Sequence, residues 1–119
     1  MDDTLYASSL IEWRAWLQAN HARASQVWLV YFKGSAHKPA ISYEDSVDEA
    51  LCYGWIDSRI KRIDDQSYAR LFTPRQPKSH WSESNKRRVR MLIQEGRMTP
   101  AGLALVNFPL DENLDSAMA

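Results

Sequence analysis

The chain has 119 residues, of which 45% are hydrophobic and 25% charged, as in an ordinary soluble globular domain. Fifteen Lys and Arg balance fifteen Asp and Glu, and this formal net charge of +0 argues against a dedicated, high-affinity nucleic-acid protein. No apolar run reaches the roughly 18 residues of a membrane span, so we expect no transmembrane helix.

The first half of the chain predicts a helix, a strand and a second helix. Ser9 and Glu12 have the spacing of a capping box, which starts a helix. Residues 26–33, QVWLVYFK, are rich in β-branched and aromatic side chains, which predicts a strand that is central or covered on both faces. Ser42 begins the second helix, and we expect Gly54 to end it with a positive φ.

The second half of the chain predicts a hairpin and two further helices. Two β-prone runs between residues 55 and 73 flank a polar turn at 64–67. Ser82 caps a third helix, and the Thr-Pro pair at 99–100 starts a short fourth helix that we expect to reach Val106. The sequence therefore predicts an α+β fold, in which a small antiparallel sheet of about three strands is packed by about four helices.

These elements form one domain. We expect it to span residues 1–119, with its core in about 9–106 and a frayed tail at 107–119. Cys52 is the only cysteine and cannot form an internal disulfide, which favours a reducing compartment. The first residues also lack the basic and apolar regions of a signal peptide, so we expect a cytoplasmic protein.

The balanced charge hides a strong segregation along the chain. Eleven of the fifteen basic residues lie between Arg59 and Arg97, and aromatic side chains such as Trp81 are interleaved with them. Such a region can hold an anion by charge and a flat ring by stacking. The alternative is that the charges only solvate one face of the protein.

The loop at 73–82 has the strongest pattern of a binding site. Arg75 and Lys78 offer cationic hydrogen-bond donors, and Trp81 offers a ring face. The helix that starts after Ser82 has free N–H groups, which attract anions. We expect an anion-binding role here, against the alternative that Ser82 only caps the helix and the charges are solvated.

A second pattern follows the second helix. Asp57 lies beside apolar Ile56 and a basic strand, where it could act as a general base or as a ligand-orienting acceptor. A structural acceptor for backbone N–H groups is the alternative, and the one we favour. The complete set of candidate ligand-binding residues is Asp57, Ser58, Arg75, Lys78, Ser79, Trp81, Ser82 and Asn85.

Metal, cofactor and nucleophile patterns are weak. The three histidines are isolated in the sequence, so we expect no metal site. Neither a Gly-rich phosphate loop nor a G-x-S-x-G elbow is present, and we expect no cofactor. Cys52 lies among apolar neighbours, which favours an inert core thiol over a nucleophile.

Four pieces of the sequence together resemble the YdeI/OmpD-associated family, also called bacteriocin-protection proteins. They are WLVYFK at 28–33, ISYEDSVDEALCYGWIDS at 41–58, FTPRQPKSHWSESNKRRV at 72–89 and GRMTPAG at 96–102. The resemblance covers about residues 9–106 and only the N-terminal part of the family. It implies a bacterial cytoplasmic protein linked to stress or bacteriocin resistance, and it supplies no catalytic residues.

Three functions follow as hypotheses. The first is a binding module for an anionic small molecule or an acidic protein surface, with weak nucleic-acid binding as a further option. The second is an enzyme of unknown reaction that uses Asp57, His80 or Ser79. The third is a protein-interaction module without a small ligand.

Overall fold

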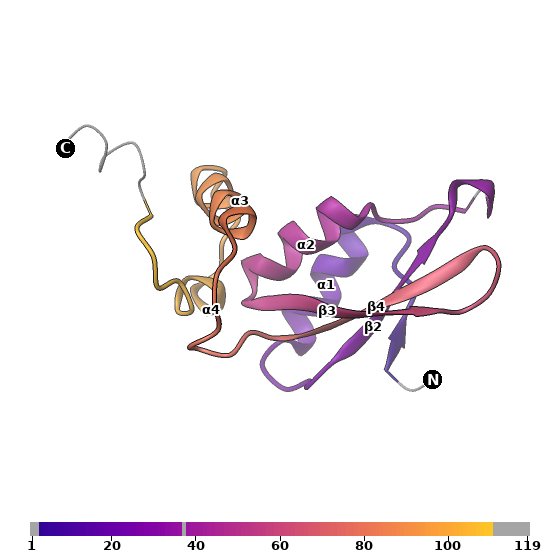
Figure 1. Cartoon of the computed structure of the whole chain (residues 1–119), viewed down its shortest axis with the longest axis horizontal. Coiled ribbons are helices and arrows are strands. Elements are labelled where there is room, and N and C mark those ends of the chain that lie inside the picture. The colour runs from indigo at the N-terminus through magenta and orange to yellow at the C-terminus, as the bar shows by residue number, and fades with distance from the viewer. Residues whose placement is uncertain (1–2, 37, 111–119) are drawn as a thin grey trace.

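The computed structural model describes residues 3–36 and 38–110, and Figure 1 shows the arrangement of its elements. As predicted, the fold is α+β: one four-stranded sheet is combined with four α-helices. In chain order the elements are β1 Thr4–Leu5, α1 Leu10–Asn20, β2 Val27–Phe32, the 3-10 turn η1 Gly34–Ala36, α2 Tyr43–Cys52, β3 Trp55–Arg62, β4 Ser67–Pro74, α3 Glu83–Gln94 and α4 Pro100–Leu103.

The sheet has the strand order β1-β2-β4-β3. Its β2–β4 and β4–β3 pairs are antiparallel, which confirms the hairpin and the central position of β2. The sheet is mixed, because β1 pairs parallel with β2 through Thr4 opposite Trp28. This fourth strand has only two residues, which is too short for the alternating pattern that reveals a strand in a sequence.

Strand β3 lies at the sheet edge and contains a β-bulge. The register shifts between Asp57 and Ile60, so that Ser58 and Arg59 together oppose Leu71. A bulge of this kind bends its strand and increases the local twist. The side chains of β3 from Ser58 onward are exposed.

The helix starts agree with the predicted caps. The hydroxyl oxygens of Ser9, Ser42 and Ser82 each accept a hydrogen bond from the backbone N–H three residues further on. The capping box at the first helix was wrong in one detail: the Glu12 carboxylate accepts from the backbone and hydroxyl of Ser8, not from Ser9. The fourth helix is shorter than expected and ends at Leu103.

Helices α1 and α2 pack on the same face of the sheet (Figure 1). The Trp13 indole contacts the Phe72 ring edge-on, with 5.2 Å between ring centroids, and its N–H donates to the Ser46 carbonyl at 3.0 Å. The Tyr31 hydroxyl lies 2.6 Å from Ser46 Oγ. Helices α3 and α4 lie beyond one end of the sheet (Figure 1).

The end of α2 and the start of α4 are in direct backbone contact. Gly54 has φ +77°, as its predicted helix-ending role requires. The carbonyl oxygen of Cys52 accepts from the backbone N–H of Thr99 at 3.0 Å and from its hydroxyl at 2.6 Å. Gly102 packs so closely on the Cys52 carbonyl that a Cβ atom there would lie 2.5 Å from its oxygen. This contact fixes α4 and the segment that follows it.

Among the residues that the structure describes, no helix is long and apolar enough to cross a bilayer.

Candidate functional site

Arg75 organises the loop between β4 and α3. Its side chain is only 8% exposed, and its guanidinium lies over the Trp81 ring, 3.7 Å from the ring centroid. Its Nη2 donates to the carbonyl oxygens of His80 at 3.2 Å and Ser79 at 3.4 Å. Its backbone N–H donates to the Gly54 carbonyl at 2.8 Å. These contacts fix the loop in one shape.

The charge of Arg75 is not balanced by a carboxylate. Within residues 3–36 and 38–110, no Asp or Glu forms an ion pair with Arg75, and its buried Nε has no hydrogen-bond partner. Burial therefore lowers the pKa of the Arg75 guanidinium from its ordinary value. An unbalanced buried cation favours nearby negative charge, because the interior screens it weakly.

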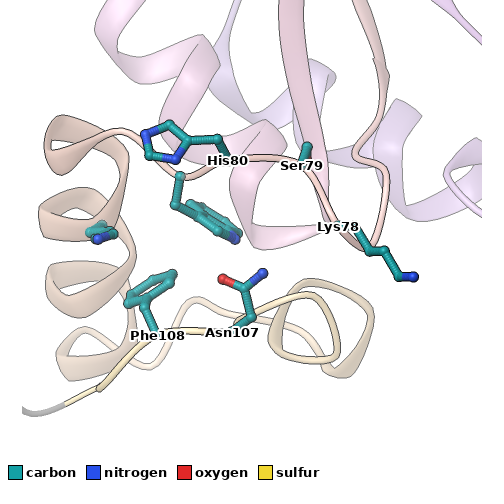
Figure 2. Close-up of a pocket in the computed structure, with 7 residues that line it drawn as sticks. Lys78, Ser79, His80, Asn107 and Phe108 are labelled. Carbon is teal, nitrogen blue, oxygen red and sulfur yellow. The ribbon is translucent and has the colours of Figure 1, made fainter.

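A pocket of about 400 Å³ opens beside this loop (Figure 2). Figure 2 shows Ser79 and His80 on the loop, with Asn107 and Phe108 on the chain segment that faces it. The residues that line the pocket are Lys78, Ser79, His80, Trp81, Lys86, Asn107 and Phe108. Basic, hydroxyl, amide and aromatic groups therefore meet at one opening.

The wall opposite the loop is held by aromatic and cationic contacts. The Phe108 ring meets Trp81 edge-on, with 5.0 Å between centroids. Arg90 on α3 donates from Nε and Nη2 to the Pro109 carbonyl, at 3.1 and 3.0 Å. Lys86 Nζ lies 6.0 Å from the Phe108 ring centroid and 3.2 Å from Glu83 Oε1. The segment after α4 is thereby anchored to α3.

Three of the eight residues proposed from the sequence line this pocket: Lys78, Ser79 and Trp81. Arg75 does not line it, but it stacks against Trp81. Ser82 and Asn85 serve the helix start instead, because the Ser82 hydroxyl accepts from the Asn85 backbone N–H at 3.1 Å. We therefore assign these two residues to structure rather than to the pocket.

Asp57 and Ser58 are not among the residues that line this pocket. The Asp57 carboxylate accepts from the Tyr43 hydroxyl at 3.1 Å and lies 3.7 Å from Arg70 Nη1, on the helix-covered face. The Ser58 hydroxyl donates to the Leu71 carbonyl at 3.4 Å within the bulge. The eight residues thus do not all line this pocket. The contacts of Asp57 are structural, but they are made by the side chains of Tyr43 and Arg70 rather than by the backbone N–H groups that we expected.

Sequence reasoning missed two residues of the pocket. Asn107 and Phe108 fall in the stretch that we expected to be a frayed tail, whereas the structure packs Phe108 against the core. The available signal was a lone aromatic residue in a polar segment. The rest of the expected tail, residues 111–119, lies outside the described residues.

A family model matches residues 5–105, most of the chain, and its description is "Domain of unknown function (DUF8412)". The chain belongs to the DUF8412 family. No curated protein and no solved structure matches the chain. The family description names no activity, so the function rests on the geometry of this member.

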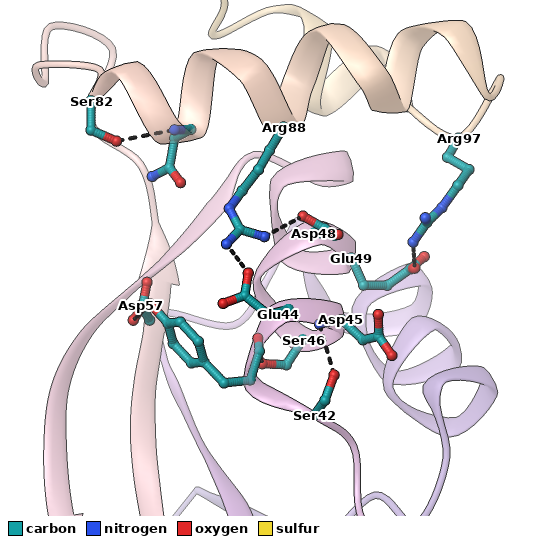
Figure 3. Close-up of polar contacts among 12 residues, drawn as sticks. Ser42, Glu44, Asp45, Ser46, Asp48, Glu49, Asp57, Ser82, Arg88 and Arg97 are labelled. Atoms are coloured by element: carbon teal, nitrogen blue, oxygen red, sulfur yellow. Dashed lines mark hydrogen bonds and ion pairs between the residues drawn. The ribbon is translucent and has the colours of Figure 1, made fainter.

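In this family member, basic residues of the 59–97 stretch form ion pairs with acidic residues of α2 (Figure 3). Arg88 of α3 pairs with Glu44 and with Asp48 Oδ1, the latter at 2.8 Å. Arg97, after α3, donates to Glu49 Oε2 at 2.7 Å. The acidic face of α2 therefore meets the basic face of α3, and these cations are not free to bind a ligand.

A second hollow of about 310 Å³ lies beside Leu10 and Ile11 of α1. Its charged lining groups are Arg14, Glu49 and Arg97, and both arginines pair with Glu49. Its polar groups therefore satisfy one another. Within the described part of the chain, no group of His, Cys, Asp and Glu residues has an arrangement that could hold a metal ion.

Cys52 is predicted to be unreactive in the folded protein. It is fully buried, and burial, with a smaller contribution from the Glu49 carboxylate, raises the pKa of its thiol from 9.0 to about 11. Because only the thiolate attacks disulfide reagents, the native protein should react with Ellman's reagent at pH ~8 far more slowly than the urea-unfolded chain. Rapid, stoichiometric reaction of the native protein would contradict this.

The same shift has a consequence for stability. The native state holds the Cys52 thiol proton more tightly than the unfolded state does, so the protonated thiol adds to the free energy of unfolding. This added stability is complete below pH 9 and decreases as the pH rises toward about 11. In Cys52→Ala, the alkaline decrease in stability should be smaller than in the wild type.

Proposed function

We propose that this protein is a binding module for a small anionic ligand, which it holds in the pocket between the 75–82 loop, α3 and the 107–108 segment. One observation carries the proposal: the ionisable side chains that line the pocket, Lys78, His80 and Lys86, are all basic. Lys86 has a carboxylate neighbour in Glu83, whereas Lys78 has no ion-pair partner in the described part of the chain. Anions concentrate at a concave surface with charge of one sign.

The polar groups beside these cations suit an oxyanion. The Asn107 amide can donate to the ligand. The Ser79 hydroxyl already donates its single proton to the Gln76 carbonyl at 2.9 Å, so it can donate to an anion only by giving up that bond. Unpaired Arg75 lies behind Trp81 and adds positive charge from inside the fold. A volume of about 400 Å³ lies within the range of small-molecule sites.

We also propose that the protein is related to the YdeI/OmpD-associated family and has a role in stress or bacteriocin resistance. The support is the four matching sequence pieces, above all the stretch at 72–89, which contains the pocket loop. We also propose a cytoplasmic location, because the lone Cys52 is a buried free thiol, as is usual in a reducing compartment.

The proposal is tested by removing the two pocket lysines. We expect isothermal titration with inorganic phosphate, pyrophosphate, citrate and a nucleoside monophosphate to detect binding of at least one of these anions. The Lys78→Ala/Lys86→Ala variant should then weaken that binding about tenfold, which corresponds to roughly 1.4 kcal/mol for the charge-assisted hydrogen bonds that the substitutions remove.

The matched control is Arg23→Ala/Arg87→Ala, which also removes two positive charges, here from exposed residues that do not line the pocket. Its affinity should stay within about twofold of the wild type, because exposed charges that do not contact the ligand are screened by salt. Equal weakening by both variants, or no binding of any of the four anions, would overturn the proposal.

A further inference from the structure

The sheet has a second face that no described helix covers. Strand alternation places Trp28, Val30 and Phe32 on the side opposite the core residues of β2. Val30 and its cross-strand neighbours Ala69 and Leu71 are buried, yet they lie outside the hydrophobic core cluster. We call this surface of the sheet the open face.

Aromatic residues line one side of the open face. The Trp28 side chain is half-buried and, among the described residues, its indole has no hydrogen bond and no ring or cation partner. Tyr6 is 44% exposed and packs edge-on against Phe32, with 4.9 Å between centroids. Lys38 Nζ lies 4.9 Å from the Phe32 ring centroid. Trp28 and Tyr6 thus offer ring faces on which a flat base can stack.

Two cations line the other side. Lys61 pairs with Ala69 and so points to the open face, and Arg59, two residues earlier and next to the bulge, lies on the same side. The side chains of both are exposed and have no hydrogen bond or ion pair within residues 3–36 and 38–110. Arg59 is about two strand spacings, roughly 10 Å, from Trp28 across Leu71. A phosphate and its stacked base can therefore contact both sides at once.

The acids nearest this surface are already engaged. Asp64 accepts from the Gln66 backbone N–H at 2.8 Å and from the Ser67 hydroxyl at 2.9 Å, and Asp65 pairs with Arg62. Asp3, near the β1 edge, accepts from the Gln26 amide at 3.4 Å. Only Asp65 is paired with a cation, so Asp64 at the hairpin turn and Asp3 beside β1 keep their negative charge, whereas Arg59 and Lys61 supply positive charge on the open-face side of β3.

We propose that the open face binds single-stranded nucleic acid, with the phosphates along Arg59 and Lys61 and a base stacked on Trp28. Positive charge on one side and partly exposed aromatic rings on the other are the two features of sequence-tolerant single-strand sites. An acidic protein surface would use the cations but would not need the Trp28 ring. This site is separate from the anion pocket and does not depend on it.

The test measures binding of fluorescein-labelled oligothymidylate and oligouridylate by fluorescence anisotropy at several salt concentrations. We expect Arg59→Ala/Lys61→Ala to weaken binding and to reduce the slope of log affinity against log salt by roughly 1.4, because each phosphate that is no longer neutralised accounts for about 0.7. Trp28→Leu should weaken binding about tenfold because stacking is removed, with the slope unchanged, whereas Trp28→Phe keeps a ring and most of the affinity. A duplex of the same length should bind more weakly than the single strand.

The controls separate this site from general charge and from the pocket. Arg23→Ala/Arg87→Ala removes two exposed cations outside the open face and should leave the salt slope and affinity nearly unchanged. Circular dichroism of each variant shows that the fold is retained.

The proposal is overturned if no oligonucleotide binds at low salt, if the control variant weakens binding as much as Arg59→Ala/Lys61→Ala, or if only the Lys78→Ala/Lys86→Ala pocket variant loses binding. Equal affinity of Trp28→Leu and wild type, with polyglutamate as an effective competitor, would assign the surface to an acidic protein instead.

Discussion

Gly102→Ala should destabilise the protein by about 3 kcal/mol. A Cβ atom at this position would lie 2.5 Å from the Cys52 carbonyl oxygen and 2.7 Å from that of Leu51. Both obstacles are backbone atoms at the end of α2, so no side-chain rotation relieves the clash, and overpacking of this kind costs up to about 3 kcal/mol. Urea denaturation monitored by tryptophan fluorescence measures the loss.

The same substitution should also damage the anion pocket. The clash pushes α4 away from α2, and the segment with Asn107 and Phe108 follows α4 directly. Gly34→Ala is the matched control, because a Cβ at Gly34 meets no atom within 4 Å. Its stability should stay within about 0.5 kcal/mol of the wild type. If Gly102→Ala is as stable as Gly34→Ala, the close α2–α4 contact does not exist in solution.

Replacing both Arg14 and Arg97 by Met should also cost about 3 kcal/mol. The Glu49 side chain is only 2% exposed, and its two oxygens pair with these arginines, one from α1 and one from the segment after α3. Without them the Glu49 carboxylate is buried with no positive charge beside it. Removing only the cations of a buried ion pair is strongly destabilising for this reason. Thermal and urea unfolding give the loss of stability.

A third substitution shows whether that cost comes from the stranded charge. Adding Glu49→Met to the double variant removes the buried carboxylate and should restore most of the lost stability, since apolar groups of similar size replace buried ion pairs well. Arg62→Met is the control, because its pair with Asp65 is exposed, and it should change stability by less than about 1 kcal/mol. If the triple variant is no more stable than the double variant, packing rather than charge accounts for the loss.

Local signals predicted the helices well. Ser9, Ser42 and Ser82 each lie at a helix start, where a short side chain satisfies a nearby backbone N–H. Gly54 and Gly96 have positive φ at helix ends. Cap and glycine signals depend on a few neighbouring residues, so the sequence contains all the information that they need.

Features that depend on distant partners were not predictable in this way. The strand at Thr4 exists only because β2 offers it a free edge, and the bulge at Ser58 appears only in the register with β4. In the site, Lys78 and Trp81 were found from their own loop. Phe108 was not, because its place is set by contacts to α3 and to Trp81, which no local pattern encodes.

The bulged edge strand bears on how copies of this protein behave in a crowded solution. A straight edge strand presents an even row of backbone N–H and C=O groups on which another chain can add a strand. In β3 the extra residue at Ser58–Arg59 interrupts that row, and an antiparallel pairing of two copies centred near Lys61 and Arg62 would bring exposed like charges together. The hairpin is thereby protected against edge-to-edge aggregation, even though the chain as a whole carries no net charge to keep its copies apart.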